Sequence, residues 1–383
     1  MERLTLTDFR CYPRLRLDLD ARPVVLTGAN GAGKTNLLEA ISFLAPGRGL
    51  RGARLAEVGR RSPGTEPGGA ARPWAVAAHL VGRNGGLDLG TGSEVVNEGG
   101  RERRSIRIDG ETAKSQAVLS EVTAVVWLTP QMDRIFLEGP SARRRFLDRL
   151  VYGFDPAHAG RVAAYEHALR ERARLLTSGG ADAHWLSALE ETMAAKGVAV
   201  AAARLETAAR LNVLTAEPRG PFPGARLEAT GEAEIWLGEG PALAAEDRLR
   251  AALEASRRAD SETGGAAHGP HRSDFKVAHL AKALPADQCS TGEQKAVLIA
   301  IVLANARLLA GERGELPLVL LDEVLAHLDE NRRAALIGEI RDLGLQAWFT
   351  GTDWAPFAPF GAGAQHFRIE EGRAFPAETA REL

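Results

Sequence analysis

The sequence predicts an α/β protein built on a parallel sheet and joined to a second, mostly helical domain. A glycine-rich segment, residues 28–35, lies between a short apolar run and a helical pattern, as in proteins that bind phosphate groups. Roughly the last hundred residues alternate helix and strand patterns, which favours a parallel sheet. Residues 156–214 have the spacing of amphipathic helices. With 383 residues, the chain is long enough for about two domains.

The composition limits the classes of function. Lys and Arg total 48 and Asp and Glu total 50, so the net charge of −2 argues against a uniformly basic nucleic-acid binder but allows local basic patches. The two cysteines, Cys11 and Cys289, do not suggest a disulfide framework, and we expect each to be a small buried residue. The sequence has no metal-ligand spacing, signal segment or membrane-length apolar run, and therefore predicts a soluble cytoplasmic protein.

Alternating apolar residues predict the first strands. Leucines alternate with polar residues around residues 4–6 and 15–19, as in half-buried strands. Residues 24–26 are a short apolar run ending at Gly28, which we interpret as the central strand feeding the glycine-rich segment, and residues 35–44 have helical spacing. Further elements of a mixed sheet, and one flexible loop, are expected as follows: strands at 74–81, 105–108 and 124–128, and the loop at 62–69.

The middle of the chain predicts a helical hairpin. Helices are expected at 156–178 and 182–214, separated by Gly179 and Gly180, with arms about 30–45 Å long. Apolar and aromatic residues recur along them at helical spacing: Tyr165, Leu169, Leu176, Trp185, Leu189 and Met193. Such a stripe serves either the seam of a projecting arm or plain core packing, and both alternatives stay open.

The remaining elements follow a break at residues 218–223. They are strands at 226–230 and 234–237, a helix at 245–258, a helix at 292–309, a strand at 318–321, a helix at 331–343 and a strand at 347–350. We expect residues 1–135 and 255–383 to form one discontinuous domain, and residues 136–254 to form the helical domain.

Residues 28–35 match the phosphate-loop pattern G-x-x-x-x-G-K-[ST]. In such a loop, backbone N–H groups form an anion cradle at a helix N-terminus. Gly28 and Gly33 permit the required backbone geometry, Lys34 is expected to reach the β- and γ-phosphates, and the Thr35 hydroxyl is expected to hold Mg²⁺. The segment therefore predicts binding of ATP and Mg²⁺.

Two carboxylates end the apolar run at residues 318–321. Ligands bind at the carboxyl edge of open sheets, so Asp322 is placed to hold the Mg²⁺ shell. Glu323 is placed to polarise a water molecule for attack on the γ-phosphate. The alternative is an ordinary exposed acidic pair, but the phosphate loop favours a catalytic set of Glu323, Lys34 and Asp322.

A second phosphate-binding candidate opens the helix at residues 290–294, Ser-Thr-Gly-Glu-Gln. One nucleotide has no use for two such sites in one subunit, whereas two chains packed head to tail give each ATP one of each. The alternative is a simple helix cap by Ser290 or Thr291.

Several longer segments resemble the RecF family of bacterial DNA repair and replication proteins, in the SMC-like branch of the ABC-type ATPases. They are residues 6–12, 28–41, 47–51, 143–148, 269–274, 290–295 and 320–329. The resemblance implies an ABC/SMC-like P-loop ATPase head with mixed and parallel sheets, a compact helical second domain, and a dimer that forms with ATP.

The resemblance also implies the site residues. Those that contact the nucleotide are Gly28, Asn30, Gly31, Gly33, Lys34, Thr35, Asn36, Arg10, Gln131, Ser290, Gly292, Gln294 and Asp329. Those at the metal are Thr35, Asp322 and Gln131. Of these, Ser290, Gly292 and Gln294 would face the γ-phosphate of the partner, and Asp329 would lie along the dimer interface.

Three positions depart from the family's pattern. Gln131 stands where an acidic residue is more common, and Ser273 stands where Asp is more common. The switch histidine of transporter ATPases is absent, because residues 349–353 read Phe-Thr-Gly-Thr-Asp, which leaves the γ-phosphate sensor near Thr352 open.

The function implied by the resemblance is weak, DNA-stimulated ATP hydrolysis by a dimer that binds junctions of single- and double-stranded DNA, including gapped duplex. The family works with RecR and RecO to load RecA. Two alternatives stay open: the ATPase subunit of a membrane transporter, and a nucleotide-gated DNA scaffold whose hydrolysis is incidental. A nuclease is disfavoured, since no second acidic metal cluster accompanies Asp322 and Glu323.

Two basic stretches are candidates for contact with DNA phosphates. Their members are Arg48, Arg51, Arg54, Arg60 and Arg61, and Arg101, Arg103, Arg104 and Arg107. The alternative for each stretch is a solvated charged face. The adjacent residues Arg143, Arg144 and Arg145 cannot share one helix face, so at least one is expected to pair internally or at the dimer interface. We expect His271 and Arg272 to support the site rather than to act as a catalytic pair.

Overall fold

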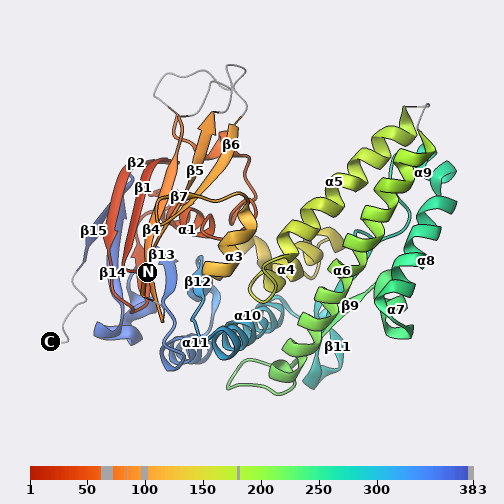
Figure 1. Ribbon diagram of the computed structural model, residues 1–383. Coiled ribbons are helices and arrows are strands. Elements are labelled where there is room, and N and C mark those ends of the chain that lie inside the picture. The colour runs from red at the N-terminus through yellow and green to blue at the C-terminus, as the bar shows by residue number, and fades with distance from the viewer. Residues whose placement is uncertain (62–71, 84, 96–101, 179–181, 378–383) are drawn as a thin grey trace. The chain divides into compact units, whose positions relative to one another are not determined.

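The computed structural model describes residues 1–61, 72–83, 85–95, 102–178 and 182–377, and the chain forms two compact units (Figure 1). Unit 1 comprises Met1–Met132, Gly220–Phe222 and Val302–Leu383, and unit 2 comprises Asp133–Arg219 and Pro223–Ile301. The sequence-based division into 1–135 with 255–383, and 136–254, stays a prediction. The predicted loop at 62–69, Arg101 and the Gly179–Gly180 separation lie outside the described residues.

The first sheet of unit 1 is antiparallel, with strand order β2-β1-β4-β5-β6-β7. Its strands are β1 (Arg3–Phe9), β2 (Tyr12–Asp18), β4 (Ala75–Gly82), β5 (Gly85–Val95), β6 (Glu102–Ile108) and β7 (Glu111–Thr112). The predicted leucine alternation is present, because Leu4, Leu6, Leu15 and Leu17 are all buried. Strand β5 was not predicted, since its five-residue run Gly-Leu-Asp-Leu-Gly lacks a long apolar alternation.

The second sheet of unit 1 has the order β15-β14-β3-β13-β12-β8, parallel from β14 to β8, with β15 antiparallel at one edge. Its strands are β3 (Val24–Thr27), β8 (Val125–Leu128), β12 (Leu318–Leu321), β13 (Ala347–Gly351), β14 (Gln365–Glu370) and β15 (Arg373–Pro376). Every residue of β3, β8, β12 and β13 is buried, as in a sheet covered on both faces. The prediction of an α/β fold with mixed and parallel sheets is confirmed.

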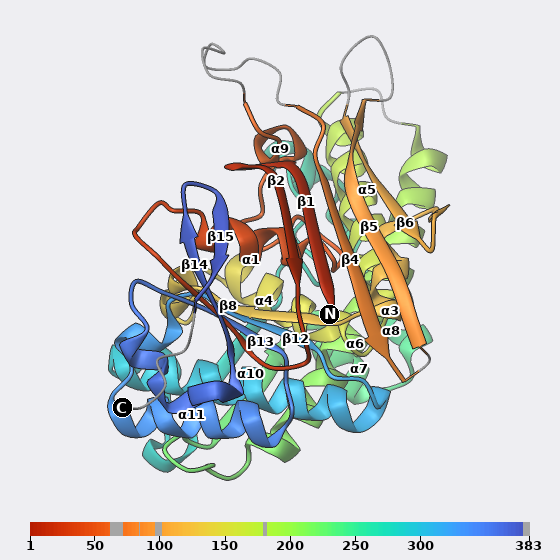
Figure 2. The same cartoon turned by 90° about the vertical axis from the view of Figure 1, so that its left-hand side faces the viewer.

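Helices connect and cover these sheets. Helix α1 (Lys34–Ser42) contacts β1 of one sheet and β8 and β13 of the other, so it lies between them (Figure 2). Phe9, Phe43 and Trp74 pack together beside it, with ring centroids 5.0–6.0 Å apart. The other helical segments of unit 1 are α2 (Leu55–Val58), η1 (Gln116–Val118), α3 (Leu119–Val122), η5 (Val324–His327), α11 (Glu330–Asp342) and η6 (Ala355–Gly363).

Unit 2 combines helices with a three-stranded antiparallel sheet of order β11-β10-β9. The helices are α4 (Pro140–Tyr152), α5 (His158–Thr177), α6 (Ala183–Thr215), α7 (Glu232–Glu239), α8 (Ala242–Ala255) and α9 (Arg257–Thr263). The strands are β9 (Ala225–Thr230), β10 (Asp274–His279) and β11 (Leu284–Pro285). The 3₁₀ segments are η3 (Leu280–Lys282) and η4 (Ala286–Gln288).

The helical hairpin is confirmed as α5 and α6, and its apolar stripe serves core packing. Tyr165 and Met193 are buried together with Leu249 and Leu253 of α8, which packs along α6. Trp185 was expected in the same stripe but is half exposed, because it lies in the first turn of α6, ahead of Leu186, the first buried residue of that helix.

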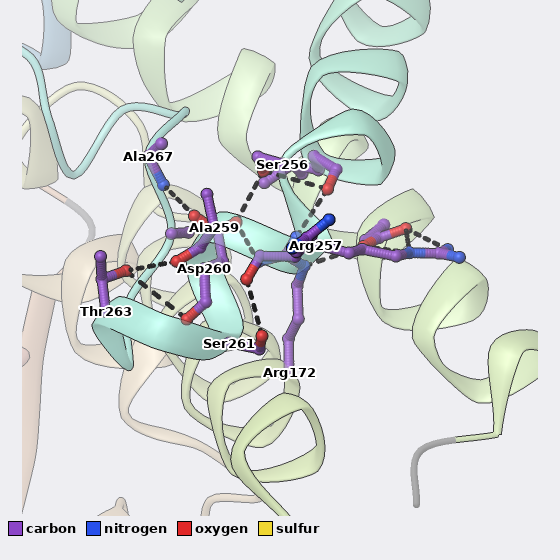
Figure 3. Close-up of polar contacts among 12 residues, drawn as sticks. Arg172, Ser256, Arg257, Ala259, Asp260, Ser261, Thr263 and Ala267 are labelled. Carbon is purple, nitrogen blue, oxygen red and sulfur yellow. Dashed lines mark hydrogen bonds and ion pairs between the residues drawn. The ribbon is translucent and has the colours of Figure 1, made fainter. Parts of the chain in front are cut away.

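A buried ionic cluster joins four helices of unit 2 (Figure 3). Arg172 of α5 donates to Glu190 Oε1 of α6 at 2.8 Å and to Asp260 Oδ2 of α9 at 2.7 Å. Its third nitrogen donates to the carbonyl of Leu253 in α8 at 2.6 Å, and Ser256 donates to Asp260 Oδ2 at 2.6 Å. Arg172, Glu190 and Asp260 are each 1 % exposed, and Arg257 also donates to both Glu190 oxygens, so two arginines balance two carboxylates.

Two of the sequence predictions for unit 2 are wrong. Residues 234–237 belong to helix α7 rather than to a strand, because Gly231 accepts the first helical hydrogen bond from Ile235 N–H at 3.0 Å and acidic residues occupy the first turn. The expected helix at 245–258 is instead two helices, α8 and α9, with Ser256 at the junction.

Helix α10 (Thr291–Arg313) runs from unit 2 into unit 1. Among the described residues it is the one helix whose length and apolar composition would suffice to cross a membrane, yet 72 % of its most apolar stretch is buried inside the protein. That burial is typical of a core helix.

Candidate nucleotide site

The phosphate loop lies at the carboxyl edge of the parallel sheet, where the described fold places strand ends from distant parts of the sequence. Strand β3 ends at Thr27, and its neighbour β13 ends at Gly351 in the same register. Gly28 has φ +148°, and an added Cβ would lie 2.3 Å from the carbonyl oxygen of Ile369 in β14. At Gly33, with φ +116°, an added Cβ would lie 2.8 Å from Tyr12 Oη. Both positions therefore require glycine.

Lys34 opens helix α1 and folds over the loop. Its Nζ donates to the carbonyls of Gly28 at 2.6 Å and Ala29 at 2.9 Å. Burial lowers the pKa of Lys34, an effect that the carboxylates of Glu323 and Asp322 oppose. The first N–H groups of an α-helix have no intrahelical acceptor, so the turn that Lys34 and Thr35 begin presents donors and a cation to an anion.

Asp322 is brought to this edge by β12, and two threonines hold it. Thr35 Oγ1 donates to Asp322 Oδ1 at 3.0 Å, and Thr350 Oγ1 donates to the same oxygen at 2.7 Å. Burial raises the pKa of Asp322, and the two hydroxyl donors oppose that rise. Mg²⁺ prefers oxygen ligands, and it is commonly bound by one or two protein oxygens together with phosphate oxygens and water. The hydroxyl of Thr35 and the carboxylate of Asp322 are oxygen ligands of this kind. The residues present therefore fit the metal predicted from the sequence.

Glu323 follows Asp322 in a left-handed backbone conformation, φ +53°. Its N–H donates to Thr350 Oγ1 at 2.9 Å, so one threonine orients both acidic residues. Thr350 was not among the predicted site residues, although it lies in the segment noted for lacking a switch histidine. A polar residue ending a strand beside β3 was the available signal.

A second polar group surrounds Glu39, which is fully buried in α1. Arg10 donates to both Glu39 oxygens at 2.7 and 2.9 Å and to the Glu57 carbonyl at 2.6 Å, so all its nitrogens are used within unit 1. Arg51 donates to Asn36 Oδ1 at 2.7 Å and to Glu39 Oε2 at 3.0 Å. Arg51, assigned from the sequence to a basic stretch, thus lies beside the first turn of α1.

Two further predicted residues of unit 1 lie in a 3₁₀ segment and at a helix N-terminus. Gln131 is exposed in η2 (Pro130–Arg134), which follows β8, and β8 pairs with β12 in parallel so that Leu128 faces Leu321. Gln131 and Asp322 therefore leave neighbouring strands at the same edge. Asp329 caps α11, where its Oδ1 accepts from Arg332 N–H at 2.8 Å.

Three predicted nucleotide contacts, Ser290, Gly292 and Gln294, belong to unit 2. Ser290, Thr291 and Gly292 are exposed at the start of α10. The Ser290 N–H donates to Glu293 Oε2 at 3.0 Å, which is one half of a capping box. Gln294 is only 3 % exposed, and its amide donates to the Cys289 carbonyl at 2.9 Å, shaping the turn from inside.

Several candidate residues turn out to support the fold instead. Arg104 is 8 % exposed and donates to the carbonyls of Phe43, Ala45 and Gly47, while burial lowers its pKa to about 10, so it is not available to DNA. Arg143 pairs with Asp274 through two bonds of 2.8 Å, which confirms that one of the three adjacent arginines pairs internally.

The suggested pair His271 and Arg272 is likewise structural within unit 2. His271 Nδ1 contacts the Tyr165 hydroxyl at 2.6 Å, and both His271 Nε2 and Arg272 Nε bond to the Ala266 carbonyl. Ser273, noted as a departure, donates to Glu234 Oε2 at 2.7 Å. The described arginines that stay exposed in the two basic stretches are Arg48, Arg51, Arg54, Arg61, Arg103 and Arg107.

Within the described ranges, no group of three or more His, Cys, Asp or Glu side chains forms a metal-binding cluster.

Solved structures share this fold across the whole chain. The recombination mediator protein RecF-ATP in RecFOR pathway matches with a TM-score of 0.81 at 23 % identity, covering 98 % of this chain and 97 % of that one. An Smc head domain with an extended coiled coil, from Pyrococcus furiosus, matches with a TM-score of 0.51 at 16 % identity, covering 98 % and 95 %.

Sequence comparisons reach further. The family model described as RecF/RecN/SMC N terminal domain matches residues 1–350. The DNA replication and repair protein RecF of Allorhizobium ampelinum is 48 % identical over 374 residues, covering 97 % of each chain. The protein of the same name from Caulobacter sp. strain K31 is 51 % identical over 385 residues, covering 96 % of each. Identity at this level over nearly the full length of both chains places this protein in the RecF family.

Proposed function

We propose that this protein is a DNA-binding ATPase of replication and recombinational repair, which closes as a head-to-tail dimer on DNA when it binds ATP and reopens after slow hydrolysis. The observation that carries the proposal is the contact between Thr35 and Asp322, which lie 287 residues apart in the sequence and meet beside the phosphate loop at 3.0 Å. A fold that brings a phosphate-loop hydroxyl onto a strand-end carboxylate is suited to a nucleotide and its cation.

Each residue has a distinct part in the proposed reaction. The loop amides and Lys34 bind the β- and γ-phosphates, and Thr35, Asp322 and Gln131 hold the metal shell. Mg²⁺, when bound, neutralises charge that develops on the phosphate oxygens. Glu323 accepts a proton from the attacking water, while Thr350 holds the backbone of Glu323 in position. Lys34 is held in place by the loop carbonyls until phosphates arrive.

The second half of each site is proposed to come from another copy of the chain. Ser290 and Gly292 are exposed at the N-terminus of a long helix, where backbone donors favour an anion. Gln294 shapes that turn, and Asp329 caps the helix along the proposed interface. Residues 1–135 with 255–383 would serve as the ATPase head, and residues 136–254 as the helical arm domain.

The partners proposed for the closed dimer follow the family. They are single-strand/double-strand junctions and gapped duplex DNA, and RecO and RecR in the loading of RecA, in the cytoplasm. The exposed members of the two basic stretches supply charges suited to DNA phosphates. The name borne by relatives about half identical over the full length supports this assignment.

Sedimentation tests the proposal directly. Wild type, Lys34→Met and Ser290→Arg would each be sedimented with ATP·Mg²⁺ and a gapped duplex at fixed salt. We expect wild type to form a dimer on DNA and both variants to remain monomeric, since one variant removes the cation at the phosphates and the other blocks the helix N-terminus with a large side chain.

A wild-type protein that stays monomeric with ATP and DNA would overturn the head-to-tail model and leave the Ser290 segment as a helix cap. Co-purification with a membrane subunit would instead favour the transporter alternative.

A further inference from the structure

The first turn of α10 contains a carboxylate where the proposed function requires an anion to bind. Glu293 follows Ser290 by three residues, and its Oε2 accepts the Ser290 N–H at 3.0 Å. An acidic residue stabilises the N-terminus of a helix, but its charge repels a triphosphate that approaches the backbone N–H donors of the same turn. The sequence motif alone therefore contains an electrostatic conflict.

The structure pairs this carboxylate with a lysine from another element. Lys282 Nζ forms an ion pair with Glu293 Oε1, while Glu293 Oε2 stays on Ser290. The Lys282 contact, followed by the Ser290 hydrogen bonds, lowers the pKa of Glu293 to about 2, so the carboxylate is ionised at neutral pH and its charge is balanced by the ammonium. The pKa of Lys282 is raised by the same contact.

The backbone around Lys282 is held on both sides. Lys282 ends η3 in the short connection between β10 and β11, where Ala278 faces Pro285 and His279 faces Leu284. Ala283 adopts a left-handed conformation, φ +52°, and donates to the Leu280 carbonyl at 3.0 Å.

A short turn connects the hairpin to the start of α10. The Cys289 N–H donates to the Ala286 carbonyl at 3.2 Å, directly after β11 and directly before Ser290. The ammonium of Lys282 therefore reaches Glu293 from a hairpin that is separated from α10 by one short, hydrogen-bonded turn. All of these residues belong to unit 2.

We propose that Lys282 is a positioning residue for the partner's γ-phosphate: it neutralises Glu293 and keeps that carboxylate on the Ser290 N–H, so that an acidic helix start can receive an anion. This inference rests on the proposed function, because it concerns the same head-to-tail site. It adds that the charge of the site is set by a hairpin outside the motif itself.

The test is a set of charge variants compared in ATP-dependent dimerisation. Wild type, Lys282→Gln, Lys282→Arg, Glu293→Gln and the double variant Lys282→Gln/Glu293→Gln would be sedimented across a titration of ATP·Mg²⁺ at low salt. Lys276→Gln is the matched control, because it removes the same charge from an exposed position on β10 of the same hairpin.

We expect Lys282→Gln to raise the ATP concentration for half-dimerisation by about threefold to tenfold, and the shift to shrink at high salt. Lys282→Arg and Lys276→Gln should behave as wild type. Glu293→Gln should dimerise no worse than wild type, and the double variant should recover most of the loss, because removal of the carboxylate removes the need for its counter-ion. Thermal unfolding of all variants should coincide.

The outcomes separate this inference from the proposed function. If wild type does not dimerise with ATP, the proposed function fails. If wild type dimerises and Lys282→Gln matches Lys276→Gln, the role of Lys282 is overturned and the proposed function stands. If the double variant remains as weak as Lys282→Gln, neutralisation of Glu293 is not the mechanism and the inference is equally overturned.

Discussion

At the candidate site, the fold buries the carboxyl group of Asp322, and burial disfavours its ionised form. Burial raises its pKa, and the hydroxyl donors of Thr350 and Thr35, with a smaller effect of the Arg51 charge, oppose that rise. A carboxyl group whose native pKa exceeds its ordinary value binds its proton more tightly in the folded state than in the unfolded state. Stability is therefore lost as pH rises from the ordinary value of 3.8 through the raised one.

Asp322→Asn is accordingly expected to stabilise the nucleotide-free protein near neutral pH while preventing ATP hydrolysis. Thermal unfolding between about pH 4 and pH 8 would show the variant gaining on wild type as pH rises, since only wild type must ionise a buried carboxyl. Glu371→Gln, at an exposed turn of the same unit, should show no such pH-dependent gain. A wild type more stable than Asp322→Asn at pH 8 would contradict the argument.

Burial distinguishes the arginines that support the fold from those that are candidates for contact with DNA. Arg103 and Arg104 are adjacent in β6. Arg104 is buried and donates to backbone carbonyls of the segment after α1, whereas Arg103 is exposed. The alternation of a strand places the two side chains on opposite faces. A basic stretch in a strand therefore contributes only every second residue to a surface.

At the scale of elements, the hairpin of unit 2 is held by charge as well as by apolar packing. Arg172, fully buried in α5, reaches α6, α8 and α9, and each of its nitrogens has a partner. Removing one member of such a cluster leaves its partner charged in a place that water does not reach. The bond between Arg172 and Asp260 joins α5 to α9. Asp260 itself is held in place because it also accepts from Ser256 Oγ and from the Ala267 N–H.

Asp260→Asn is expected to lower the free energy of unfolding by about 3–5 kcal/mol, because it leaves Arg172 without one of its counter-ions. Urea unfolding followed by circular dichroism would measure the change. Glu262→Gln is the matched control on the same helix: its side chain is 71 % exposed, so its effect should stay within about 0.5 kcal/mol. Equal midpoints for the two variants would show that the buried charge is compensated elsewhere.

For the molecule as a whole, the decisive feature is a proposed site divided between two regions of the chain. The phosphate loop and Asp322 lie in unit 1, whereas Ser290 and Gly292 lie in unit 2. A site shared between two copies makes assembly depend on nucleotide, and hydrolysis then becomes the step that reverses assembly. Binding and turnover are separable in such an arrangement, because different residues serve them.

Glu323→Gln is expected to slow ATP hydrolysis by about a hundredfold or more, since it removes the proposed proton acceptor, and to leave ATP-dependent dimerisation intact. Phosphate release and sedimentation with ATP and gapped DNA would be measured on the same preparation, with Lys34→Met as the variant that loses both properties. A Glu323→Gln protein that supports every cellular activity of wild type would favour the nucleotide-gated scaffold instead.

The sequence by itself determined the class of fold, the helical hairpin and the position of the phosphate-loop motif. Short-range patterns predict these features, namely strand and helix periodicity and the glycine spacing around Lys34. Only the tertiary structure decided which polar groups meet. Thr350 joins Asp322 from 28 residues away, Arg172 joins Asp260 from 88, and Arg104 reaches Phe43 from 61. Burial requires each polar group to find a partner, and the fold, rather than local periodicity, determines which partner lies within reach.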